Sequence, residues 1–248
     1  MRLWRKPLAC AGGGARVALV AAGEYGYYEF RALDRPLEDA EYDQVRAILP
    51  GQARVTHRRV LSECRPGEFA ADQGALMERY FDAHLYCARG GMRVLMIRLP
   101  LDRFDLDAAA QYTFVDRGPA RRVRGRAEPF AIRQTGGHAI VTWRSQDCGE
   151  ARPEQARFSL NRLVRTRAEL EFGDLRPLYL GWLAALGVSR DPRDAEPEDD
   201  GWGEPPVPPG LRDLTHTQRG LVDFLRLDPD LLAAAAQAGR FLGDVLTP

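Results

Sequence analysis

Residues 27–100 decide the fold, and they begin with the alternating run Tyr27-Tyr28-Glu29-Phe30-Arg31-Ala32-Leu33-Asp34. Apolar and charged side chains alternate in the middle of this run, and a period of two is typical of a strand with one buried face. Pro36 follows it and suits the first turn of a helix, so a helix is expected over 37–49. Residues 53–61 contain several β-branched side chains and are predicted to form a second strand.

A second helix is predicted over residues 72–88. Asp72 is a suitable N-cap, and apolar side chains then recur at spacings of three and four residues, the pattern of a helix with one buried side. They are Leu76, Met77, Tyr80, Phe81, His84, Leu85 and Ala88. Arg89-Gly90-Gly91 ends this helix, and the apolar run at 92–99 is typical of a central strand covered on both faces.

The remaining chain adds one hairpin and several helices. Gly136-Gly137 predicts a tight turn between strands 130–135 and 138–143, because glycine tolerates positive φ angles. A short helix is expected within 101–113, with Asp105 or Asp107 as its cap. Helical patterns also cover the stretch after Phe158, residues 217–227 and the segment that starts at Pro229.

These elements predict an α+β fold, with a mixed sheet of about five strands, packed helices and a helical C-terminal region. The chain is divided accordingly. Residues 1–23 form a disordered leader or follow a start codon assigned too early, 24–188 form the α+β core, 189–210 form an acidic and Pro-rich linker, and 211–248 form the C-terminal helical segment.

Composition limits the classes of partner. The 35 basic and 35 acidic residues give a formal net charge of zero, which argues against bulk attraction to nucleic acid or to an anionic membrane. Only Lys6 among the basic residues is lysine, so the many arginines reflect codon bias of a GC-rich bacterial genome. The four cysteines lack paired spacing, which favours a reducing cytoplasm. No apolar run is long enough for a membrane-spanning helix.

Residues 27–37 and 76–86 together resemble a family of uncharacterised, mostly actinobacterial proteins. Pro205-Pro206-Val207-Pro208-Pro209-Gly210-Leu211 and residues 224–232 extend the resemblance nearly to the C-terminus. Residues 62–69 depart from the family pattern, which has an aromatic and histidine-containing segment there. The resemblance implies a cytoplasmic protein, and it transfers no activity, cofactor or catalytic residue.

Two kinds of chemistry are possible around the second helix. An enzyme or a small-ligand-binding protein would use Tyr80, Asp82 and His84 with Glu63 from the preceding loop. The three-residue spacing of His84 and Cys87 would also suit a metal, but His84 falls on the apolar stripe, where a buried hydrogen-bonded histidine is the commoner case. We therefore expect no metal and no cofactor.

One basic cluster favours phosphate binding. It consists of Arg117, Arg121, Arg122, Arg124 and Arg126. The zero net charge and the acidic residues at 191–204 oppose this hypothesis, so nucleic-acid binding is the lesser alternative.

The C-terminal helices carry a group of apolar side chains that cannot stay in water. Leu221, Phe224 and Leu225 either dock on their own domain, dimerise or bind a partner, and Trp202 in the acidic linker is a candidate anchor for such a partner. The function that the sequence favours is a non-catalytic cytoplasmic interaction or accessory protein, with an unknown protein as its partner.

Overall fold

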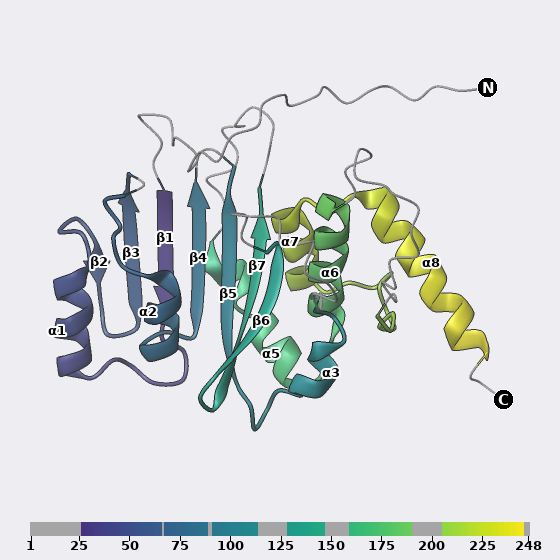
Figure 1. The fold of residues 1–248 in the computed structure, drawn as a ribbon, viewed down its shortest axis with the longest axis horizontal. Helices are drawn as coiled ribbons and strands as arrows, with labels where there is room; N and C mark the ends of the chain where they lie inside the picture. Colours follow the sequence, from purple (N-terminus) through teal and green to yellow (C-terminus); the bar gives the residue numbers. More distant parts are fainter. Residues whose placement is uncertain are drawn as a thin grey trace, which may run out of the picture.

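The computed structural model describes residues 26–65, 67–88, 91–113, 128–146, 159–189 and 205–245. Its centre is a seven-stranded sheet with the order β2-β3-β1-β4-β5-β7-β6, and every neighbouring pair of strands is antiparallel (Figure 1). The strands are β1 (Gly26–Arg31), β2 (Arg54–Val55), β3 (Arg59–Cys64), β4 (Ala83–Ala88), β5 (Arg93–Pro100), β6 (Phe130–Thr135) and β7 (His138–Ser145).

The α+β class is confirmed, but the mixed sheet of about five strands is wrong. The predicted strand at 53–61 is two strands, because Thr56 closes a tight turn in which its hydroxyl accepts from the amides of Arg58 and Arg59 at 3.4 and 2.9 Å. The turn reverses the chain, so that β3 reaches β1 in the antiparallel direction. The other additional strand, β4, comes from the predicted second helix.

That second helix ends much earlier than its pattern suggests. Asp72 caps it as expected, accepting from the amides of Gly74 and Ala75, but the helix ends at Arg79. Residues 83–88 form β4 instead, between β1 and β5. A strand that is buried on both faces has no polar alternation, so the spacing of its apolar residues fits a helix equally well.

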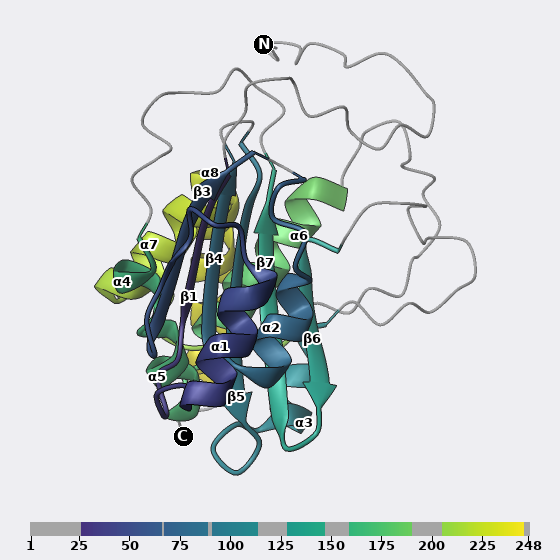
Figure 2. The same cartoon turned by 90° about the vertical axis from the view of Figure 1, so that its left-hand side faces the viewer.

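The sheet separates two hydrophobic clusters. We call the face that α1 and α2 cover the front face, and Phe30 and Met96 lie in its cluster. The opposite face is the back face, where Leu95 and Trp143 lie in a cluster with residues of α4 to α7. Figure 2 shows α1 and α2 on one side of the sheet and α4, α5 and α7 on the other. The helices are α1 (Asp39–Ile48), α2 (Gln73–Arg79), α3 (Leu106–Ala110), α4 (Leu160–Leu163), α5 (Thr166–Glu171), α6 (Arg176–Ser189), α7 (His216–Leu225) and α8 (Pro229–Val245).

Several local predictions are confirmed. Gly136 has a φ of +54° in the turn that joins β6 to β7, a conformation that glycine adopts without strain. Asp105, one of the two expected caps, accepts from the amide of Ala108 in α3. The helix expected from Pro229 is α8, and Asp228 accepts from the amide of Asp230 in its first turn.

The C-terminal helix α7 docks on the chain's own sheet. Phe224 is fully buried in the back-face cluster. Arg93 of β5 donates to the backbone carbonyls of Asp223 and Phe224, and the Ser145 hydroxyl donates to that of Leu225. These bonds satisfy carbonyls that the end of a helix leaves free, so α7 is part of the same folded body as the sheet.

The last part of the predicted linker also packs on this body. Pro205 and Pro208 are buried, and the hydroxyl of Tyr112 donates to the carbonyl of Pro206 at 3.1 Å. Residues 190–204 lie outside the described residues. Within the described part of the chain, none of the helices combines the length and the apolar character needed to span a bilayer.

Gly181 allows α6 to approach the β6–β7 hairpin closely. A Cβ atom at this position would lie 2.5 Å from the Phe130 ring and 2.7 Å from Trp143 Nε1. We expect Gly181→Ala to lower the free energy of unfolding by about 1 to 3 kcal/mol, the usual effect of overpacking a core. Urea denaturation would measure it, with Gly51→Ala as the control, because nothing lies within 4 Å of a Cβ at Gly51. An equal effect of both substitutions would contradict the close approach.

Candidate functional site

The structure does not bring together the four residues of the predicted enzymatic group. Glu63 is exposed on β3 and belongs to the back face, because it pairs with Tyr27 across β1. His84 belongs to the front face, where its ring stacks on Phe30. Tyr80 follows α2, and its hydroxyl donates to Gln44 Oε1 at 2.7 Å. Glu63 and His84 therefore lie on opposite faces of the sheet.

Asp82 connects two parts of the backbone. Its Oδ2 accepts from the amides of Leu33 and Asp34 at 2.6 and 3.1 Å, and Arg98 donates to its Oδ1 at 2.7 Å. The side chain is 2% exposed. Asp82 therefore holds the segment that follows β1 against the start of β4, which is a structural role.

His84 is a neutral core histidine. Burial lowers its pKa to about 3 from an ordinary value of 6.5. A neutral imidazole has a single N–H. Nδ1 lies 3.0 Å from the carbonyl of Glu29, which only accepts, so the proton is on Nδ1. The Oε1 atom of Gln73 lies 3.0 Å from Nε2. With the ring proton on Nδ1, this contact becomes a hydrogen bond when the Gln73 amide is flipped, so that its nitrogen faces Nε2.

The other predicted site residues have different outcomes. Arg117, Arg121, Arg122, Arg124, Arg126 and Trp202 all lie outside the described residues. Leu221, Phe224 and Leu225 are buried in the back-face cluster, so they are not an exposed docking surface. Their intramolecular docking was one of the alternatives that the sequence left open.

A buried carboxylate that the sequence did not single out organises the back face at β1. Glu29 is fully buried, and Tyr27 donates its hydroxyl to Oε2 at 2.8 Å. Arg31 and Arg59 both donate to Oε1 at 2.9 to 3.0 Å, while the amide of Leu160 at the start of α4 donates to Oε2. Burial would raise the pKa of Glu29, but these hydrogen bonds hold it below its ordinary value.

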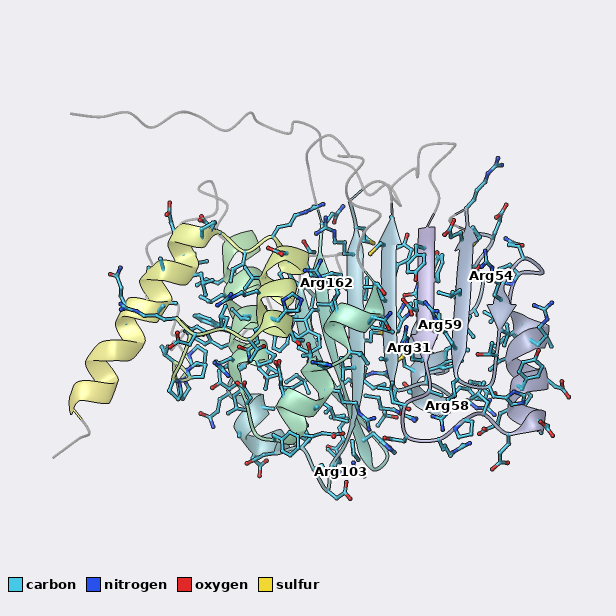
Figure 3. The ribbon with its side chains drawn as sticks, turned by 180° about the vertical axis from the view of Figure 1, so that it is seen from behind. Arg31, Arg54, Arg58, Arg59, Arg103 and Arg162 are labelled. Carbon is cyan, nitrogen blue, oxygen red and sulfur yellow. The ribbon has the colours of Figure 1, made fainter. Side chains whose placement is uncertain are left out.

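Arg31 and Arg59, which bind Glu29, belong to a larger set of arginines on this side of the molecule that we name the arginine face. Figure 3 shows them from behind, four of them over β1, β2 and β3. They are Arg31, Arg54, Arg58, Arg59, Arg103 and Arg162. The register explains part of this grouping: Arg31 pairs with Arg59, and Arg54 pairs with Leu61 two positions further along the same side of β3.

The arginine face keeps a positive charge. Arg31 and Arg59 share the single carboxylate of Glu29, and Arg103 reaches Glu171 only at 3.9 Å. Arg58 donates to the backbone carbonyl of Leu33 and forms no ion pair with a residue that the structure describes. Arg54 and Arg162 are exposed, and their guanidinium groups have no hydrogen bond or ion pair with another described residue.

The sequence held part of this signal. The alternation in residues 27–34 already places Glu29 and Arg31 on the polar side of the first strand. The codon-bias argument gives single arginines little weight, however, and the pairing of Arg31 with Arg59 depends on a register that only the folded sheet provides.

No cluster of three or more potential metal ligands occurs within the part of the chain that the structure describes. The comparison with protein-family models, with curated proteins and with solved structures gives no match for this chain.

Proposed function

We propose that this chain is a non-catalytic binding protein whose arginine face docks an acidic segment of a partner protein. The observation that carries the proposal is the set of exposed guanidinium groups around the buried Glu29. Arginine binds carboxylates through paired N–H donors, and arginine is enriched in protein interfaces.

Glu29 makes part of the face rigid before any partner arrives. Its carboxylate fixes Arg31 and Arg59, whose side chains are 21% and 41% exposed, so both remain accessible. The guanidinium groups of Arg54 and Arg162 donate to no described residue, so their N–H donors can bind a ligand. A surface that is already ordered loses less entropy when it binds.

Phe172 favours a protein over a nucleic acid as the partner. This side chain is 90% exposed and follows Glu171, the residue that Arg103 approaches. An exposed aromatic residue beside charged groups is typical of a protein-binding hot spot. Tyr27 is the aromatic residue on the strands of the face, and its hydroxyl is bound to Glu29, so stacking of bases there has little support.

Binding of fluorescein-labelled poly-L-glutamate to the full chain tests the proposal by anisotropy. We expect affinity that falls with added salt, because exposed ion pairs are screened. Arg54→Gln with Arg162→Gln should weaken binding by up to about thirtyfold, as each exposed ion pair contributes up to about 1 kcal/mol.

The matched control is Arg79→Gln with Arg219→Gln, which removes the same charge from α2 and α7. Equal loss of binding in both double variants would show that net charge, and not the arginine face, is responsible. Binding of a single-stranded oligonucleotide without binding of poly-L-glutamate would contradict the choice of partner.

A further inference from the structure

A cleft of about 530 Å³ opens on the front face of the sheet, on the side opposite the arginine face. Its floor comes from β5, β6 and β7, and one wall comes from residues 71–74 at the start of α2. The complete lining is Ala71, Asp72, Gln73, Gly74, Met96, Arg133, Ile140, Thr142 and Arg144.

The register of the sheet explains why these side chains converge. Ile140, Thr142 and Arg144 alternate along β7, so all three point to the same face. Met96 pairs with Thr142 from β5, and Arg133 pairs with Ile140 from β6. The result is a floor with apolar side chains in the middle and a guanidinium group at each end.

The two arginines differ in how they are engaged. Arg133 forms an ion pair with Glu78 of α2. Arg144 donates to the backbone carbonyl of Glu128 at 3.0 Å and forms no ion pair with a described residue. Its side chain is half-buried; burial lowers the pKa of Arg144, and the nearby Glu128 carboxylate offsets part of this effect. A charge in such a place favours an anion beside it.

Neutral polar groups complete the cleft. Thr142 is 6% exposed, and its hydroxyl has no hydrogen bond with another described residue. The side-chain amide of Gln73 lies against Nε2 of the buried His84, with Oε1 at 3.0 Å, so its position is fixed from the core. The Asp72 carboxylate already accepts from Gly74 and Ala75 through one oxygen, which directs it to its own helix.

We propose that this cleft binds a small organic anion, whose carboxylate or phosphate lies on Arg144 and Thr142 and whose apolar body lies on Met96 and Ile140. Pockets of this size that combine an apolar floor with a few placed polar groups are typical small-molecule sites. The site is separate from the arginine face, so it adds a second ligand to the proposed function.

Isothermal titration of the full chain with phenyl phosphate, benzoate, inorganic phosphate and phenol tests this inference. We expect phenyl phosphate or benzoate to bind at millimolar concentrations, with inorganic phosphate weaker and phenol weaker still, because both head group and body contribute. The comparison of phenyl phosphate with benzoate tells which head group the site prefers. Failure of both aromatic anions to bind, or equal binding of phenol, would overturn the proposal.

Two variants localise the binding. Arg144→Gln should weaken the better aromatic anion about tenfold or more, the effect of losing a hydrogen bond between charged groups. The isosteric Thr142→Val should weaken it about threefold to tenfold, the usual effect of losing one hydrogen bond. Unchanged affinity in both variants would overturn the site.

The double variant Arg54→Gln with Arg162→Gln should keep full affinity for the small anion. It therefore separates failure of this inference from failure of the arginine face as a docking site. Loss of small-anion binding in that variant would place the anion on the arginine face and contradict the cleft.

Discussion

Phe224→Asp should abolish the folded state at room temperature. Phe224 is fully buried between α7 and the back face of the sheet. Truncation of a buried phenylalanine alone costs about 3 to 5 kcal/mol, and an unpaired carboxylate in its place adds the free energy of desolvation. Because a whole domain is stable by only about 5 to 15 kcal/mol, the variant should unfold or melt far below the wild type. Circular dichroism during urea denaturation measures this.

Phe172→Asp is the matched control, since the same substitution is made at a side chain that is 90% exposed. We expect a change within about 0.5 kcal/mol in the free energy of unfolding, as for other surface substitutions. If Phe224→Asp kept the wild-type midpoint and only lost association with another chain, the docking of α7 on its own sheet would be contradicted, and the partner alternative would replace it.

The second large effect is a loss of stability in mild acid that comes from His84. Its pKa is about 3 in the folded protein and 6.5 in the unfolded chain. Between these values the unfolded chain binds a proton that the folded protein does not bind. The free energy of unfolding must then decrease as the pH falls below 6.5, by about 1.4 kcal/mol per pH unit.

Urea denaturation at pH 7.5, 6.0 and 5.0 measures this slope, and His84→Gln should remove it. The range stops at pH 5 so that carboxylates do not contribute to the slope. Glu29 and Asp34 have lowered pKa values in the folded protein, and the stability that they contribute is lost in stronger acid. His57→Gln is the control for the loss of a histidine, because the His57 side chain is 49% exposed, whereas His84 is fully buried. The same slope in wild type and His84→Gln would show that another group carries the acid sensitivity.

The sequence by itself determined those elements whose signals are local. The alternation at 27–34, the proline before α1, the cap at Asp72 and the glycine pair of the β6–β7 hairpin each depend on residues within a few positions. These signals were sufficient for the α+β class and for the C-terminal helices. They could not determine where α2 ends, because residues 83–88 satisfy a helical and a doubly buried strand pattern equally well.

Only the tertiary structure decided the strand directions and the two candidate binding surfaces. The turn at Thr56 makes β3 antiparallel to β1, and the register then brings Arg31 beside Arg59 at the buried Glu29. The cleft forms because the start of α2 lies beside β5 and β7. A long stretch of chain separates α2 from β7. Such groupings arise from contacts between distant residues, and periodicity along the chain carries no information on which strands become neighbours.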